Sequence, residues 1–182
     1  MTPPEAAPEV TIAPARPDDA EDIAALNNRY AADGLTLPRT PAFVAARVES
    51  YRVARDGAGR LVGCVAIDEY APSLAELVSL AVAPEAQGRG LGRRLIAAAE
   101  ALARQRGYPE LFAVSLADTL FTAAGFRQSS IARYPEKAAR YAAISRSELS
   151  IGKKFLFVKR LGTDERRAPA RGSAAPRHAG RR

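Results

Sequence analysis

The segment from residue 74 to residue 106 limits most strongly what this chain can fold into. Residues 75–82 are apolar and predict a buried strand, and three glycines alternate from residue 88 to residue 92. Apolar residues at helical spacing follow at 91–106, so the glycines connect a strand to a helix. The unpaired N–H groups and the positive dipole of such a helix start attract phosphate. The segment therefore predicts an α/β domain with a phosphate-binding loop.

This loop differs from two common nucleotide-binding motifs. A P-loop places Lys and then Ser or Thr directly after its last glycine, whereas Arg93 and Arg94 follow Gly92. The dinucleotide fingerprint separates its second and third glycines by two residues, and here the glycines alternate strictly. Two readings remain: a ligand loop of the form Gln-x-x-Gly-x-Gly, beginning at Gln87, or a glycine-rich turn without a ligand.

Length and charge indicate one domain with polar ends. The chain has 182 residues, 47 % of them hydrophobic, and no apolar run is long enough to span a bilayer. Part of the net charge of +7 comes from residues 163–182, which hold six Arg against Asp164 and Glu165. We expect disorder at 1–9, one domain at 10–162 and a disordered basic tail at 163–182. The N-terminus lacks the order of a signal peptide, which favours a cytoplasmic location.

Cysteine and histidine usage excludes several chemistries. The chain has one cysteine, Cys64, and one histidine, His178, which lies in the basic tail. One cysteine excludes an intramolecular disulfide and a cysteine-cluster metal site. A lone histidine in a polar tail excludes a histidine-based triad or zinc site. We therefore expect no metal.

Local signals predict the remaining elements. Thr40 and Pro41 indicate one helix start, and Asp18 with Glu21 indicates a capping box at another. The helix that begins at Pro41 should bury Phe43, Val44 and Val48. We further expect helices at 119–124 and 135–143, and strands at 10–13, 51–54, 61–67, 111–115, 128–131 and 155–159. The order β-α-α-β-β-β-α-β-α-β predicts an α/β domain with a mixed sheet.

The loop and this order resemble the GNAT acetyltransferases, whose acetyl-CoA loop reads Gln/Arg-x-x-Gly-x-Gly/Ala. The resemblance extends to residues 34–40, which read Gly-Leu-Thr-Leu-Pro-Arg-Thr, and to residues 50–54, 61–66, 75–82 and 111–115. Over about residues 10–130 the chain is similar to the acetyltransferase domain of N-acetylglutamate synthases, which begin arginine biosynthesis. The resemblance implies the GNAT fold, in which helices flank a mixed central sheet with a V-shaped splay between the fourth and fifth strands.

The resemblance also implies acetyl-CoA as co-substrate. The loop would hold the pyrophosphate, and the preceding strand would pair with the pantetheine arm while its N–H groups hold the reacting oxyanion. The residues implied are Leu80, Ala81, Val82, Gln87, Gly88, Arg89, Gly90, Leu91, Gly92 and Arg93.

Two residues are candidates for the acid–base chemistry. Transfer to an amine needs a base, because amines are largely protonated at neutral pH. Glu76 is the one ionisable residue within 74–83 and matches the glutamate that the family uses as base; a carboxylate on the solvent face is the alternative. Ser115 matches a serine that stabilises the leaving thiolate, or is merely a strand-end hydrogen bonder, while Phe121 stands where many GNAT enzymes have Tyr. We expect Cys64 in the core, with direct transfer in a ternary complex.

The acceptor site follows from the resemblance as well. Arg39 lies in the Leu-Pro-Arg segment that contacts glutamate in the family, and Arg suits forked pairing with carboxylates. Leu37 and Ser79 would contribute main-chain groups. Arg146 matches a second, C-terminal arginine, with Arg140 as its competitor.

Other acceptors and roles remain open. The acceptor could instead be another amino acid, a polyamine or a protein, or the chain could be a non-catalytic sensor of acetyl-CoA and amino acids. Relatives often carry an amino-acid-kinase domain that 182 residues do not accommodate, so a homodimer or a separate kinase-like regulatory subunit is an open partner. We expect no membrane partner, and weak binding of nucleic acid by the tail is a remote option.

Overall fold

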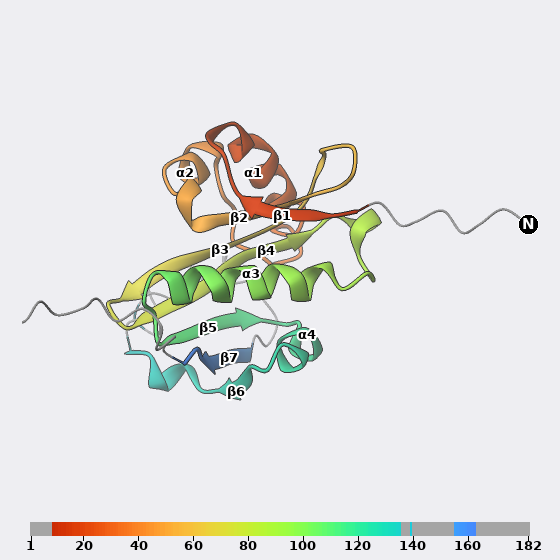
Figure 1. Ribbon diagram of the computed structural model, residues 1–182. Coiled ribbons are helices and arrows are strands. Elements are labelled where there is room, and N and C mark those ends of the chain that lie inside the picture. Colours follow the sequence, from red (N-terminus) through yellow and green to blue (C-terminus); the bar gives the residue numbers. More distant parts are fainter. Residues whose placement is uncertain (1–8, 136–138, 140–154, 163–182) are drawn as a thin grey trace, which may run out of the picture.

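The computed structural model describes residues 9–135, 139 and 155–162, and builds them around one sheet (Figure 1). The strands follow the order β1-β2-β3-β4-β5-β7-β6. The pairing of β4 with β5 is parallel, and all the other pairings are antiparallel. The expected mixed sheet is therefore confirmed. Among the described residues, no helix is long and apolar enough to cross a membrane.

The strands and helices alternate much as the sequence predicts. The strands are β1 (Thr11–Pro14), β2 (Tyr51–Arg55), β3 (Leu61–Ala71), β4 (Leu74–Val82), β5 (Glu110–Ser115), β6 (Arg127–Ser129) and β7 (Phe155–Arg160). The helices are α1 (Ala20–Asn28), α2 (Pro41–Ala45), α3 (Leu91–Gln105) and α4 (Asp118–Ala123). Short 3-10 turns occupy Pro17–Asp19, Val48–Ser50, Pro84–Ala86 and Ile131–Arg133. The helix expected at 135–143 lies largely outside the described residues.

Helix starts show where local signals succeed and fail. Thr40 caps α2 as predicted, because its Oγ1 accepts a hydrogen bond from Phe43 N at 3.1 Å. The prediction for Asp18 was wrong: the neighbouring Asp19 accepts from Arg16 N and also pairs with Arg55 of β2. The prediction for Val48 was also wrong, because α2 ends at Ala45 and Val48 belongs to a separate turn.

Helix α3 packs its apolar stripe against the sheet. The stripe comprises Leu91, Leu95, Ile96, Ala99 and Leu102, all buried as expected. A glycine in β3 makes this approach possible, since a Cβ at Gly63 would lie 2.9 Å from Leu95 Cδ1. Helices α1 and α2 lie next to each other, and α1 contacts β3 and β4 (Figure 1).

The parallel pairing of β4 and β5 covers only part of each strand. Register partners run from Leu74–Glu110 to Leu77–Ala113, whereas β4 continues to Val82 and β5 to Ser115. Beyond Leu77 the two strands separate, which is the predicted splay. The last five residues of β4 therefore have an edge that no described strand covers.

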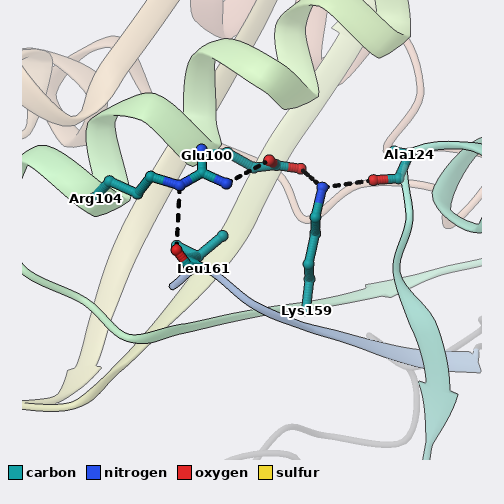
Figure 2. A network of polar contacts seen from close by, with 5 residues as sticks. All are labelled: Glu100, Arg104, Ala124, Lys159 and Leu161. Carbon is teal, nitrogen blue, oxygen red and sulfur yellow. Dashed lines mark hydrogen bonds and ion pairs between the residues drawn. The ribbon is translucent and has the colours of Figure 1, made fainter. Parts of the chain in front are cut away.

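A polar network around one buried carboxylate fastens strand β7 to α3 and to the end of α4 (Figure 2). Glu100 of α3 is 6 % exposed and accepts from Lys159 Nζ at 2.7 Å and from Arg104 Nη2 at 3.2 Å. Lys159 Nζ also donates to Ala124 O at 2.7 Å, and Arg104 Nε donates to Leu161 O at 3.3 Å. A carboxylate buried to this degree requires such partners, and the network ties α3 to β7, the strand that pairs with β5.

Candidate active site

A cleft of about 500 Å³ opens in the splay between β4 and β5. Its walls come from the ends of both strands, the glycine loop with the first turn of α3, and the segment between α1 and α2. The predicted site residues that line it are Leu37, Arg39, Glu76, Ser79, Leu80, Ala81, Val82, Gln87, Gly88, Gly90, Leu91, Gly92, Arg93 and Ser115. Arg89 is exposed beside the loop and does not line the cleft, and Arg146 lies outside the described residues.

Strand β4 carries an extra residue beside the cleft. Cys64 is opposite Ala81 and Ala66 is opposite Val78, so three steps along β4 match two along β3. Ser79 lies within this bulge at a φ of 53°, a left-handed conformation that non-glycine residues rarely adopt. A bulge interrupts the ladder and re-aims backbone groups, so Ser79 and Leu80 present main-chain groups outside the regular β3 pairing.

Buried neighbours hold this bulge. The Cys64 thiol donates to Ser79 O at 3.3 Å, and Tyr51 Oη lies 3.4 Å from Ser79 Oγ. Burial raises the pKa of Tyr51, although its hydrogen bond with Ser79 and the charge of Arg39 act in the opposite direction. Tyr51 therefore remains a neutral phenol at physiological pH.

Cys64 belongs to the core, as predicted. Its side chain is fully buried, and this burial raises the pKa of the thiol to about 12. A thiol is a nucleophile in its thiolate form, and almost none of that form exists here near pH 7. The geometry therefore disfavours an acetyl-cysteine intermediate.

The glycine loop has the conformation that an anion cradle requires. Gly88 and Gly90 adopt φ values of 73° and 75°, and a Cβ at either position would have no atom of the described residues within 4 Å. The loop surface is thus open, and its glycines are required for backbone conformation rather than for packing. Gly92 differs, because a Cβ there would touch Leu120 at 3.4 Å.

The first turn of α3 concentrates positive charge. It contains no acidic residue, and Arg93 and Arg94 follow Gly90, which caps the helix without a side-chain hydrogen bond. Cations are unfavourable at the positive end of a helix dipole, so these arginines destabilise the helix start when no anion is bound. A bound anion would relieve this repulsion. The loop and helix start fit a phosphorylated ligand.

Glu76 lies on the floor of the cleft and is 5 % exposed. Its register neighbours are Asp68 of β3 and Phe112 of β5, and the Phe112 ring is fully buried. The alternative of a carboxylate on the solvent face is therefore wrong. A buried carboxylate that reaches a cleft is the arrangement expected of a general base.

Ser115 ends β5 on the opposite wall. Its Oγ accepts a hydrogen bond from Ala117 N at 3.0 Å, which orients the hydroxyl while its own hydrogen stays available for donation. Phe121 of α4 also lines the cleft, stacked on Phe157 with ring centroids 5.3 Å apart. Because Phe121 has no hydroxyl, Ser115 is the better candidate for donating a hydrogen bond to a leaving group here.

Arg39 enters the cleft from the segment between α1 and α2. Asn28 holds its backbone from both sides: Asn28 Nδ2 donates to Arg39 O, and Arg39 N donates to Asn28 Oδ1, each at 2.8 Å. The guanidinium lies 4.4 Å from the centre of the Phe43 ring, while its buried Nε has no hydrogen-bond partner in the described part of the chain. A buried unpaired donor in a cleft suits an anionic ligand.

Residues that the sequence did not single out complete this wall. Asn27 is fully buried. Its side-chain Nδ2 donates to Leu37 O at 2.8 Å, and its backbone carbonyl accepts from Thr36 Oγ1 at 2.7 Å. Tyr30 and Leu35 line the cleft directly. Adjacent asparagines at the end of a predicted helix were the available signal, since Asn favours local hydrogen bonds there.

Comparison with known proteins identifies the family. The family model described as acetyltransferase (GNAT) family matches residues 19–127, and the chain belongs to this family. An uncharacterised N-acetyltransferase of Chlorobaculum tepidum is 33 % identical over 134 residues, which cover 74 % of this chain and 86 % of that protein. The expected GNAT acetyltransferase domain is therefore confirmed. In the described residues, no group of three or more His, Cys, Asp or Glu is placed to hold a metal.

Two further relatives are larger enzymes. An amino-acid acetyltransferase of Neisseria meningitidis is 33 % identical over 129 residues, covering 70 % of this chain but 29 % of that protein. The structure of N-acetylglutamate synthase from Neisseria gonorrhoeae with coenzyme A and N-acetyl-glutamate has a TM-score of 0.71 at 28 % identity, covering 85 % of this chain and 35 % of that one.

A Mycobacterium tuberculosis protein solved with CoA shares the fold, with a TM-score of 0.71 at 21 % identity over 82 % of this chain and 98 % of that chain.

Proposed function

We propose that this acetyltransferase transfers the acetyl group of acetyl-CoA to the α-amino group of an amino acid, with L-glutamate as the favoured acceptor and arginine biosynthesis as the setting. The observation that carries the proposal is that buried Glu76 and Arg39 line one cleft beside the glycine loop, and that the buried Nε of Arg39 has no hydrogen-bond partner among the described residues. A base and a carboxylate-binding cation in the same cleft match an amino acid as acceptor.

The cofactor wall comprises residues 78–82 of β4, the loop 87–90 and the first turn of α3, Leu91–Arg93. The open loop and the arginine-rich helix start fit the pyrophosphate of acetyl-CoA. The uncovered edge of β4 offers main-chain groups to an extended arm. Structures of related proteins contain coenzyme A or acetyl-CoA, which supports this choice of ligand.

The acceptor wall comprises residues 30–39. Arg39 would pair with a carboxylate of the acceptor, which orients the amine toward Glu76. Ser79, in the bulge, would contribute main-chain groups beside it. The coenzyme A and N-acetyl-glutamate in the N. gonorrhoeae synthase support glutamate as the first acceptor to test.

The groups that line the cleft support direct transfer. Acetyl-CoA supplies an activated thioester, and the amine nitrogen forms the new bond to the acetyl carbon as the bond from that carbon to sulfur breaks. Glu76 takes a proton from the attacking amine, and backbone N–H groups around Leu80, beside the bulge, stabilise the oxyanion. The Ser115 hydroxyl donates a hydrogen bond to the leaving sulfur. The buried Cys64 takes no part.

A second acceptor class has its own observation. Leu35, from the segment between α1 and α2, and Leu116, which follows β5, both line the cleft and are 45 % and 37 % exposed. Exposed leucines at a cleft mouth favour an acceptor with an apolar side chain, bound through the same carboxylate.

A thiol-release assay with acetyl-CoA and each of the twenty amino acids tests the proposal. Release of CoA with glutamate, and little with other amino acids, is the expected result. Turnover confined to apolar amino acids would move the assignment to the second class. Calorimetric binding of acetyl-CoA without thiol release in the presence of any amine would identify a sensor instead.

A further inference from the structure

The end of β4 shows a hydrogen-bond arrangement that links the two walls of the cleft. Tyr30, which follows α1, donates its hydroxyl hydrogen to Val82 O. Gln87 Nε2 donates to the same carbonyl at 3.1 Å and to Tyr30 Oη at 2.9 Å. Tyr30 belongs to the acceptor wall, whereas Val82 and Gln87 belong to the cofactor wall. All three residues line the cleft.

The ladder shows which way Val82 faces. Ala83 N donates to Val62 O at 2.9 Å, so Ala83 and Val62 form a hydrogen-bonded pair. Bonded and non-bonded pairs alternate in an antiparallel ladder, which makes the adjacent pair of Gly63 and Val82 non-bonded. Both the N–H and the carbonyl of Val82 therefore point away from β3. On that side β4 has no β5 residue paired with it beyond Leu77.

The two groups of Val82 are not equally accessible to a ligand. A carbonyl oxygen has two lone pairs, and Tyr30 and Gln87 occupy both of them. The N–H faces the same edge and remains the group that can bind a ligand. At this position the edge of β4 therefore offers a donor without an acceptor. An extended ligand must place a carbonyl here, which fixes its register along the strand.

We propose that Tyr30 is a positioning residue for the acyl-CoA co-substrate, which rests on the proposed function. By holding Val82 O and Gln87 together, its hydroxyl sets the register of the ligand arm along β4 and the distance from this edge to the phosphate loop. The arm and the nucleotide then bind as one aligned ligand. Tyr30 contributes to alignment rather than to either half-site alone.

Ligand fragments separate alignment from simple contact. We would measure the Kd of coenzyme A, of pantetheine (the arm alone) and of adenosine 3′,5′-bisphosphate (the nucleotide alone) for wild type and Tyr30→Phe. Coenzyme A should bind about three- to tenfold more weakly to the variant, the effect of one lost hydrogen bond. Both fragments should bind within about twofold of wild type. The KM for acetyl-CoA should rise by the same factor as the coenzyme A Kd, with little change in kcat.

Two further variants complete the test. Gln87→Ala should lower the affinity for coenzyme A by a similar factor. The double variant should bind coenzyme A as tightly as the single variant with the lower affinity, because both residues act through one arrangement. Tyr108→Phe is the matched control: it removes a tyrosine hydroxyl that donates to Glu69 and does not line the cleft. It should leave all three Kd values unchanged.

Every result of these measurements either supports the positioning role of Tyr30 or overturns it. An unchanged coenzyme A Kd in Tyr30→Phe, or an equal loss for the bisphosphate and coenzyme A, would overturn the positioning role. If pantetheine and coenzyme A lost affinity equally while the bisphosphate did not, Tyr30 would be a direct contact of the arm. That result would also overturn the positioning role. Wild-type protein that binds no coenzyme A would overturn the proposed function itself, a result distinct from the other three.

Discussion

The cofactor wall and the acceptor wall line one cleft but differ in the groups that shape them. The cofactor wall is shaped mainly by backbone conformation, with two glycines at positive φ, a bulge at Ser79 and the start of α3. The acceptor wall depends on side chains, because Asn27 and Asn28 fasten Leu37 and Arg39 to the end of α1. A backbone site can keep its ligand while its side chains change, whereas a wall held by two asparagines ties acceptor choice to a few side chains.

The largest expected effect comes from Glu76, which lines the same cleft as both walls. Glu76→Gln keeps the shape and removes the base, so kcat near pH 7 should fall by about 10²- to 10⁴-fold. The residual rate should increase with pH, since a larger fraction of the amine is then neutral. Steady-state kinetics check the rate, and calorimetry should find the acetyl-CoA Kd nearly unchanged. Turnover equal to that of wild type would remove Glu76 from the base role.

Arg39 tests the acceptor wall next. Arg39→Ala should raise the KM for glutamate by about 10- to 100-fold and leave the KM for acetyl-CoA unchanged, because a charge-assisted bond to a carboxylate is lost. Arg47→Ala is the control, since that guanidinium lies over the same Phe43 ring at 4.0 Å but does not line the cleft. Equal effects of the two substitutions would show that Phe43 packing, and not carboxylate pairing, is responsible.

Gly90 tests the cofactor wall. Gly90→Ala forces a side chain into the left-handed region at a cost of about 1–2 kcal/mol, so the KM for acetyl-CoA should rise by about tenfold with the acceptor KM unchanged. Gly107→Ala provides the same strain elsewhere: its φ is 82°, and its Cβ would also meet no atom within 4 Å. Thermal unfolding should show similar losses for both variants, and kinetics should separate them. An acetyl-CoA KM that rises in both variants would mean that stability alone is being measured.

Asn28 should have a smaller effect, because it acts on the acceptor through Arg39. Asn28→Ala removes both hydrogen bonds to the Arg39 backbone and should raise the acceptor KM by about three- to tenfold, again without affecting acetyl-CoA. Thr40→Ala removes the neighbouring helix cap and should lower stability by about 1 kcal/mol with normal KM values. If Thr40→Ala shifts the acceptor KM as strongly, the asparagine has no special role in holding Arg39.

The same contrast explains what the sequence could predict. The glycine loop, α3 and the strands around them follow from patterns within about twenty residues, and buried Glu76 follows from its place in β4. The acceptor wall depends on partners far apart along the chain: Asn28 and Arg39 are 11 positions apart, and Tyr30 and Val82 are 52 positions apart. The bulge at Ser79 was equally hidden, because an apolar strand buried on both faces shows no alternation that an extra residue would disturb.

The charge network of Figure 2 lies outside both walls and should change stability with the least effect on catalysis. Lys159→Met removes two hydrogen bonds and leaves buried Glu100 with Arg104, so the free energy of unfolding should fall by about 1–3 kcal/mol while kcat and both KM values stay near wild type at 25 °C. Arg60→Ala is the contrasting control, because its pair with Asp56 is at the surface and its loss should barely change the Tm. Adding Glu100→Gln to Lys159→Met should recover part of the loss, since the buried carboxylate is then neutral. A fall in kcat in Lys159→Met would show instead that the position of β7 reaches the cleft, through the stacking of Phe157 on Phe121.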